Sequence, residues 1–213
     1  AGVTEILSVS ACGSLKEELP PGTFVIADQF IDRTFAREKS FFGEGLVAHV
    51  ALGHPVCGRL GDAVEEACKE VGIDAVRGGT YLAMEGPQFS TRAESLTYRT
   101  WGVEVIGMTN LQEARLAREA EIGYATVAMS TDYDCWHTEH DDVSVATVVE
   151  TMKQNVTHAK ELIRRAAPMI AGMGASIADD ALEHAVMTAP DAITPAARER
   201  LALFLDKYLG EGA

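Results

Sequence analysis

Short apolar runs alternate with segments of helical periodicity along this chain of 213 residues. The apolar runs, each bounded by turn-forming residues, predict strands at 5–11, 23–31, 79–84, 103–106 and 124–129. Apolar residues spaced three and four apart predict helices at 57–71, 91–101, 112–121, 144–167 and 195–209. Strands that alternate with helices favour one layered α/β domain with a largely parallel sheet. The stretches 35–55 and 168–195 have no sustained period, and we expect loops there.

The composition excludes two classes of partner. A formal net charge of −14 argues against binding to nucleic acid or to an anionic membrane surface, because both need clustered lysine and arginine. No apolar run reaches the length of a membrane-spanning helix. The four cysteines show no paired spacing of the zinc or disulfide kind, so we expect reduced thiols and a cytoplasmic protein; they are Cys12, Cys57, Cys68 and Cys135.

Two carboxylates follow the apolar run 124–129, at the predicted carboxyl end of a strand. Ligands of open α/β sheets bind at such ends. If the backbone stays extended, Asp132 and Asp134 point to the same side, because side chains alternate along a strand. They could then grip one small group, such as the edge of a 6-aminopurine, which offers an amine and a ring nitrogen. On spacing alone, a solvated acidic turn remains the competing interpretation.

Two further strand ends carry small or polar residues. Ser10 ends the first strand and is followed by Cys12, Gly13 and Ser14, which suit a turn or a close approach to an anion. Met108 follows the strand 103–106. We expect the strand ends at Ser10, Met108 and Ser130 to converge on one rim and to form the site.

Six blocks of residues, in this order, resemble the S-methyl-5′-thioadenosine phosphorylases of the trimeric purine nucleoside phosphorylase family. The resemblance runs from residue 1 to about Ala167, and the tail 168–213, which ends in a helix, diverges. The blocks are Ser10-Ala11-Cys12-Gly13-Ser14-Leu15, Asp28-Gln29-Phe30-Ile31-Asp32-Arg33-Thr34, Glu85-Gly86-Pro87-Gln88-Phe89-Ser90-Thr91-Arg92-Ala93-Glu94-Ser95, Arg99-Thr100-Trp101-Gly102, Met108-Thr109 and Thr131-Asp132-Tyr133-Asp134-Cys135-Trp136.

The resemblance implies the nucleoside phosphorylase fold, a three-layer α/β/α domain with a mixed, largely parallel sheet. It implies a homotrimeric pentosyltransferase that cleaves methylthioadenosine with inorganic phosphate, giving adenine and 5-methylthioribose 1-phosphate, without metal or organic cofactor. His137 and His140 lie beside Glu139 and Asp141, but this reaction needs no metal and we expect none there.

By the same resemblance, residues receive roles one by one. Ser10, Ala11 and Thr109 resemble the phosphate site, Met108 the ribose contact, and Phe89, Ser90, Asp132 and Asp134 the base pocket. Val145, Val148 and Val149 resemble the wall around the 5′-methylthio group, although each could equally be the buried face of the long helix. His49 resembles a residue that reaches the site of a neighbouring subunit.

The chemistry of the cleavage fits these residue types. Breaking the ribosidic bond leaves negative charge on the purine, so a carboxyl group that holds a proton near N7 makes adenine a better leaving group. An ordinary aspartate titrates near ~3.9, so Asp132 needs burial or its neighbour Asp134 to stay protonated, and we hypothesise that the pair shares a proton. Ionised oxygens and Ser90 favour 6-aminopurines over 6-oxopurines.

The printed sequence departs from the family pattern at its start. It lacks the first strand with the Gly-Gly-Thr-Gly phosphate loop and the Arg-His pair that follows it. We therefore expect a domain spanning 1–213 that is incomplete at its N-terminal side. Two alternatives stay open: a phosphorylase for methylthioinosine or other 6-oxopurine nucleosides, and a truncated, inactive purine-binding homologue.

Overall fold

A mixed, curled sheet of seven strands forms the centre of the molecule. The computed structural model describes residues 2–138 and 145–210. Within them the strands are β1 (Glu5–Ser14), β2 (Phe24–Ile26), β3 (Gln29–Arg33), β4 (Ala75–Arg77), β5 (Thr80–Met84), β6 (Val105–Gly107) and β7 (Gly123–Asp132), in the order β3-β5-β6-β1-β7-β2-β4. β1–β7, β2–β4, β3–β5 and β5–β6 pair in parallel, whereas β1–β6 and β2–β7 are antiparallel. The predicted α/β class with a mixed, largely parallel sheet is confirmed.

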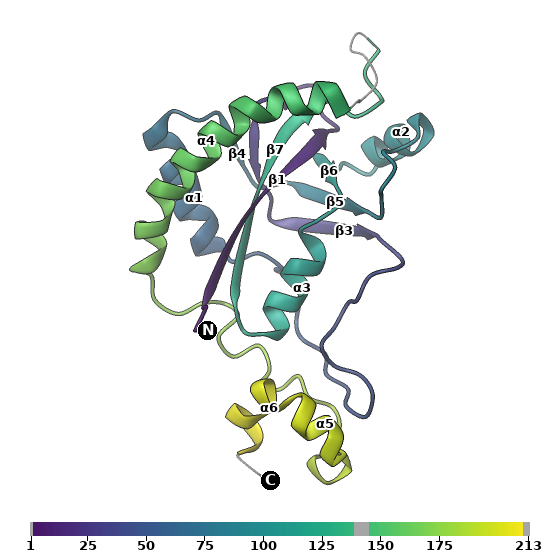
Figure 1. Ribbon diagram of the computed structural model, residues 1–213, viewed down its shortest axis with the longest axis vertical. Helices are drawn as coiled ribbons and strands as arrows, with labels where there is room; N and C mark the ends of the chain where they lie inside the picture. The colour runs from purple at the N-terminus through teal and green to yellow at the C-terminus, as the bar shows by residue number, and fades with distance from the viewer. Residues whose placement is uncertain (1, 139–144, 211–213) are drawn as a thin grey trace.

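Helices lie on both faces of this sheet (Figure 1). They are α1 (Gly58–Val71), α2 (Arg92–Thr100), α3 (Leu111–Glu119), α4 (Val145–Ala171), α5 (Pro195–Arg200) and α6 (Ala202–Leu209), with a short 3-10 turn, η1, at Pro190–Ala192. Alternation along β7 divides the two faces: Val127 and Met129 pack toward α1 and α4, whereas Tyr124 packs toward α3. The strand is buried along its whole length, because both of its faces are covered.

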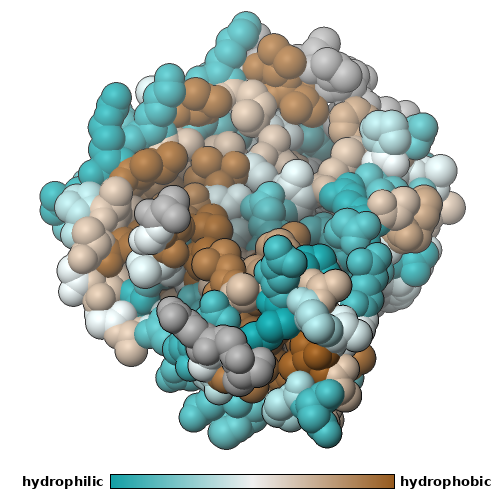
Figure 2. All heavy atoms as spheres, turned by 60° about the horizontal axis from the view of Figure 1, so that its bottom comes forward, coloured by the Kyte–Doolittle hydropathy of each residue, from teal (hydrophilic) through white to brown (hydrophobic). Residues whose placement is uncertain are grey.

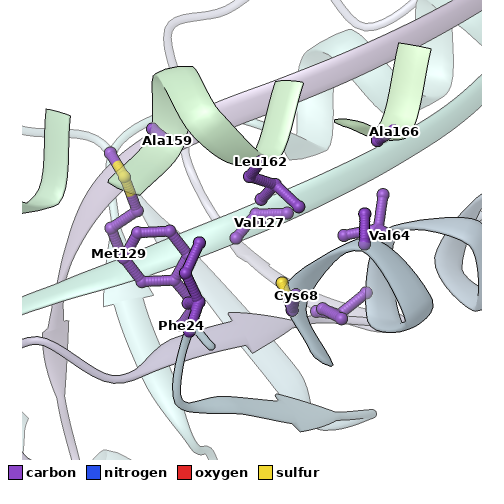
Figure 3. Packing of buried hydrophobic residues seen from close by; sticks show 11 residues of the cluster. Phe24, Val64, Cys68, Val127, Met129, Ala159, Leu162 and Ala166 are labelled. Carbon is purple, nitrogen blue, oxygen red and sulfur yellow. The ribbon is translucent and has the colours of Figure 1, made fainter. Parts of the chain in front are cut away.

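The largest core cluster lies between α1, α4 and the sheet. Figure 3 shows Leu162 of α4 over Val127 of β7, with Phe24 of β2 and Cys68 of α1 on the other side of the same cluster. Phe24, Val127 and Leu162 have no exposed surface. Burying a side chain of this size contributes about 1.5–3 kcal/mol, so this contact fixes α4 against the carboxyl end of β7.

Two strand predictions are corrected. The predicted strand 23–31 is two strands, β2 and β3, separated at Ala27 and Asp28. The backbone turns there because the amides of Asp28 and Gln29 both donate to the carbonyl of Gly79, and because β2 and β3 join the sheet near its opposite ends. The short strand β4, three residues long, was not predicted; three residues carry too little periodicity to be recognised.

The helix predictions hold at α1, α2 and α3 and need correction in the tail. The predicted helix 195–209 divides at Leu201 into α5 and α6. Helix α4 continues through Pro168 to Ala171, beyond the predicted end at Ala167, and its predicted cap Ser144 lies outside the described residues. The tail helices, at the bottom of Figure 1, pack on the 35–55 loop, because Leu201 and Leu205 share a cluster with Leu46.

The described residues contain no helix long and apolar enough to cross a membrane.

Figure 2 shows a face on which hydrophobic side chains gather around a hollow. A hollow of about 470 Å³ lies beside the start of β1, lined by apolar residues of that strand and of α4, among them Ile6, Leu7, Ile163 and Ile170.

Candidate active site

A cavity of about 310 Å³ opens where the ends of β1, β5, β6 and β7 meet the start of α4. Its lining residues come from segments far apart in the sequence and include most of the residues singled out above. They are Ser10, Ala11, Cys12, Gly13, Met84, Phe89, Ile106, Gly107, Met108, Thr109, Thr131, Asp132, Asp134 and Val148. Ser10 and Met108 meet at one cavity, as expected, whereas the third strand contributes Thr131 and Asp132 and not Ser130.

The two aspartates are buried at this cavity. Asp132 is 8% exposed and Asp134 is 6% exposed, so the interpretation as a solvated acidic turn is wrong. The expectation of an extended backbone through the pair is also wrong, because Asp134 adopts a positive φ of 52°. The side chains still share one site, since the amide of Asp134 donates to Oδ1 of Asp132 at 2.8 Å.

Burial raises the pKa of both carboxyl groups. For Asp132, loss of solvation outweighs the hydroxyl of Thr131 and the amide of Asp134, which lower its pKa. For Asp134, loss of solvation is again the largest cause, and the charge of Asp132 raises its pKa further, against the nearby hydroxyls of Ser95 and Ser90. The pair therefore retains a proton to a higher pH than isolated aspartates would.

One oxygen of the pair is buried without a hydrogen-bond donor. Oδ2 of Asp132 accepts from the Thr131 hydroxyl at 2.7 Å. Oδ2 of Asp134 is buried and makes no hydrogen bond of ordinary geometry with any described residue. A buried carboxylate oxygen without a donor costs free energy, and this cost favours the protonated form of the pair.

Glycine is required beside the pair. A Cβ atom on Gly13 would lie 3.0 Å from Oδ1 of Asp132 and 3.3 Å from Cβ of Asp134. The strand β1 has a register irregularity at the same place, between Cys12 and Gly13. The small residues Cys12, Gly13 and Ser14 were predicted to follow the first strand, but they form its last part, and close packing of the β1 backbone against the two acids explains their small size.

A buried amide organises the other end of the cavity. Nδ2 of Asn110 donates to Oγ of Ser10 at 3.0 Å and also to the hydroxyl of Thr126, and Oδ1 of Asn110 accepts from the Thr109 hydroxyl at 2.8 Å. Asn110 therefore joins the β1 end to the β6 end. Sequence reasoning missed this residue; its only signal is a polar residue just before a helix.

The backbone of Asn110 is strained. Its φ is 74° and its ψ is −50°, and the amide of Leu111 donates to the carbonyl of Thr109 at 2.9 Å, which closes a three-residue γ-turn of the rare hand. A conformation of this kind costs of order 1–3 kcal/mol and persists where the surroundings impose it. The hydrogen bonds of the Asn110 side chain are what impose it here.

We expect Asn110→Ala to lower the free energy of unfolding by about 2 kcal/mol, because it keeps the strained φ and loses the buried hydrogen bonds. Asn110→Gly removes the same bonds but tolerates the positive φ, so it should be about 1 kcal/mol more stable than the alanine variant. Denaturant unfolding of the two variants measures the difference; equal stabilities would contradict the role of strain.

The predicted base-pocket residues Phe89 and Ser90 lie at or beside the cavity. The side chain of Phe89 lines the cavity but stays 43% exposed, as a residue at its mouth. Ser90 is buried behind it, with Oγ 3.7 Å from Sδ of Met84. Thr91 begins α2 with a capping box to Glu94, as the sequence indicates, and this fixes where Phe89 and Ser90 leave the strand.

Of the three predicted valines and His49, only Val148 is found to line the cavity. Val148 lines the cavity, whereas Val149 is exposed and does not line it, and the side chain of Val145 lies outside the described residues. His49 lies away from this cavity, in a separate hollow with His54, Arg118 and His184. The distance leaves His49 without a role in the site of its own chain.

A metal cluster is not found among the described residues, where no three histidine, cysteine, aspartate or glutamate side chains come together suitably. Nε2 of His137 lies 3.1 Å from Oε1 of Glu17, and His140 with its acidic neighbours lies outside the described part of the chain. The four cysteines are buried and none forms a disulfide, and burial raises the pKa of the Cys12 thiol at the cavity well above its ordinary value.

Relatives with established names match nearly the whole chain. The S-methyl-5′-thioadenosine phosphorylase of Rhodospirillum rubrum is 58% identical over 213 residues, which are 99% of this chain and 72% of that protein. The enzyme of the same name from Koribacter versatilis is 53% identical, over 99% of this chain and 72% of its own length.

Solved structures agree with the sequences. A methylthioadenosine phosphorylase from an Antarctic soil metagenomic library superposes with a TM-score of 0.89 at 44% identity, covering 96% of this chain and 72% of that one. The methylthioadenosine phosphorylase of Schistosoma mansoni in complex with adenine superposes with a TM-score of 0.79 at 31% identity, covering 96% of this chain and 73% of that one. The model of the phosphorylase superfamily matches residues 1–168. The chain therefore belongs to the phosphorylase superfamily and, within it, to the S-methyl-5′-thioadenosine phosphorylases.

Proposed function

We propose that this protein cleaves S-methyl-5′-thioadenosine with inorganic phosphate, giving adenine and 5-methylthioribose 1-phosphate. The observation that carries the proposal is the buried pair Asp132 and Asp134, which lines the same cavity as Ser10, Met108 and Thr109. A proton-retaining acid pair on one side and hydroxyl groups on the other suit a nucleoside between a leaving base and an attacking anion.

The acid pair would act on the base. As the bond between ribose and N9 breaks, electron density moves into the purine and raises the basicity of N7. A carboxyl group of the pair donates or shares its proton there, and the remaining ionised oxygen accepts from the 6-amino group. Asp134 lines the cavity and can supply this second contact.

The opposite end of the cavity would hold phosphate. The hydroxyl of Ser10 and the backbone amides near Ala11 and Thr109 are donors of the kind that bind anions, and the Thr109 hydroxyl, which donates to Asn110, lies beside them. No lysine or arginine lines the cavity among the described residues. In the family pattern, an Arg-His pair that the printed sequence does not contain adds cationic groups, and we propose that phosphate affinity depends on such groups.

Release of free adenine from methylthioadenosine, followed with and without phosphate, tests the proposal. We expect release that depends on phosphate and the appearance of 5-methylthioribose 1-phosphate. Release without phosphate would indicate a hydrolase, and binding of the nucleoside without release would indicate an inactive purine-binding homologue; either result contradicts the proposal.

We also propose a homotrimer in which His49 completes the site of a neighbouring subunit, an expectation supported by its position outside its own cavity. Mixed assembly of inactive His49→Ala and Asp132→Asn subunits should restore part of the activity, because some sites then combine an intact His49 with an intact Asp132. If His49 served its own subunit, no mixed site would be intact and no activity would return.

Two further expectations accompany this proposal. The reaction should need no organic cofactor and no metal, with phosphate as the co-substrate, so a chelator should leave the rate unchanged. We also propose a role in purine and methionine salvage and a cytoplasmic location; the location is supported by four buried cysteines, none of which forms a disulfide.

A further inference from the structure

The loop from Thr34 to Leu46 is fastened beside the cavity by three carboxylates. Asp32 accepts from the amide and hydroxyl of Thr34, and Glu119 accepts from Ser40 and from the amide of Phe41. Between these two anchors, Oε2 of Glu85 accepts from the amides of Phe35 and Ala36, at 2.7 and 3.1 Å. Glu85 follows directly on Met84, which lines the cavity.

The side chain of Arg37, in this loop, contacts the backbone at the ends of β5 and β6. Its Nε lies 3.3 Å from Oε1 of Glu85, and its Nη2 donates to the carbonyl of Glu85 at 2.6 Å. Its Nη1 donates to the carbonyl of Met108. One planar guanidinium group therefore joins the end of β5 to the residue that follows β6. The Arg37 side chain is 26% exposed, so these bonds are partly shielded from water.

The contact with Met108 acts on the next amide. A trans peptide is planar, so holding the carbonyl of Met108 on the Arg37 side directs the N–H of Thr109 to the opposite side. That nitrogen lies 3.5 Å from the Tyr81 hydroxyl, a long contact, and Thr109 lines the cavity. A positive group on the carbonyl also polarises the peptide and strengthens its N–H as a donor.

The side chain of Met108 is held by the same arrangement. A Cβ on Gly86 would lie 2.5 Å from Sδ of Met108, so the methionine runs closely over the glycine that follows Glu85. Gly86 has a φ of 68°, which glycine adopts without strain. Arg37 thus sets both the backbone and the side-chain neighbour of Met108.

We propose that Arg37 is a positioning residue for the phosphate end of the site. It orients the Met108–Thr109 peptide so that the Thr109 amide donates to the attacking phosphate, without touching phosphate itself. This inference rests on the phosphorolysis proposed above. It predicts a loss in the use of phosphate that leaves adenine binding unchanged, because Asp132, at the end of β7, and Asp134, in the turn after it, are not among the hydrogen-bond partners of Arg37.

Steady-state kinetics of the full protein with phosphate varied test this role. For Arg37→Ala we expect kcat/KM for phosphate to fall by about 10²-fold, the scale of a misplacement of about 1 Å in a catalytic site. The dissociation constant of adenine should stay within about threefold of the wild-type value, because the acid pair keeps its contacts. Free guanidinium at millimolar concentration should restore part of the rate of the alanine variant. It should leave the rate of the wild-type protein unchanged.

Two matched variants separate positioning from charge and from loop stability. Arg37→Lys keeps the charge but not the planar fork, so it should recover only a small part of the loss. Lys39→Ala removes a cation of the same loop that contacts the end of β3, 3.3 Å from Asp32, and has no hydrogen bond to the ends of β5 or β6; it should behave as wild type.

Equal losses in adenine binding and phosphate use, or a loss that guanidinium does not relieve, would assign Arg37 to general stability and overturn the inference. A wild-type protein that releases no adenine would instead refute the proposed function. In that case the Arg37→Ala variant is judged by phosphate binding in calorimetry, where unchanged affinity overturns the inference independently.

Discussion

Asp132→Asn is expected to lower turnover of methylthioadenosine by about 10³-fold and to leave the fold intact, because it removes one general acid. The amide is isosteric, and its oxygen can still accept from the amide of Asp134, the bond that now holds the pair together at 2.8 Å. The measurement is kcat at saturating phosphate, with circular dichroism to compare the folds. A variant that keeps near-normal turnover would show that no proton passes from this residue.

A matched control is available at another strand end. Asp28→Asn makes the same chemical change at a residue outside the cavity, where the carboxylate accepts from the amide of Gly79. We expect that variant to turn over at the wild-type rate.

The pH dependence has a definite sign. The pKa values of Asp132 and Asp134 are both raised, first by burial, so the protonated form that protonates the base persists to higher pH. Turnover should therefore fall as the pH rises through the apparent pKa of the pair. In the Asp132→Asn variant this decrease at high pH should be absent from the pH–rate profile.

Stability follows the same linkage. The folded state holds the proton more tightly than the unfolded chain, whose aspartates titrate near ~3.9. The contribution of the pair to the free energy of unfolding is therefore fully present below that pH. It is lost as the pH rises through the pKa of the pair in the folded state. The asparagine variant cannot ionise at this position. The free energy of unfolding of this variant, relative to that of the wild type, should therefore increase as the pH rises.

Methylthioadenosine should be preferred over methylthioinosine by a factor on the order of 10⁴ in kcat/KM, because a site built for one hydrogen-bond pattern leaves buried groups unpaired with the other. The 6-amino group can donate to an ionised oxygen of the acid pair, whereas a 6-oxo group would present an acceptor to that acceptor. Parallel assays of both nucleosides measure the ratio. Equal rates would place the base elsewhere in the cavity.

The variant Asp134→Asn tests the origin of this preference. An amide can donate to a 6-oxo group, so the ratio should fall mainly because methylthioinosine is used better. Ser90→Ala serves as a comparison, since Ser90 lowers the pKa of Asp134 but presents no carboxylate to the base. A preference unchanged in Asp134→Asn would show that this residue does not read the 6-position.

Much of the fold was predictable because its elements are locally encoded. Helix α1 ends at Gly72, with a φ of 71°, and α2 begins at a Thr91–Glu94 capping box, both as the sequence indicates. The strands β5 and β7 were found from their apolar runs. Local patterns failed where long-range contacts decide the backbone, as at Asp28, whose amide is held by the distant Gly79.

The candidate site was predictable in its members but not in its geometry. The ends of β1, β6 and β7 were expected to meet, and the residues Ser10, Met108 and Asp132 do line one cavity. The positive φ of Asp134 was not expected, and neither Asn110 nor Arg37 stood out. Their roles depend on partners 100 and 71 residues away along the chain, Ser10 and Met108, which no local pattern connects.

The sequence by itself determined the alternation of strands and helices, the acid pair and the family of the chain, because periodicity, capping and motifs depend on neighbouring residues. Only the tertiary structure decided that the two aspartates are buried at a cavity and that Arg37 holds the Met108 carbonyl. The physical reason is that solvation and hydrogen-bond geometry depend on which distant segments pack together. A carboxylate becomes a proton-retaining acid only once that packing has removed its water.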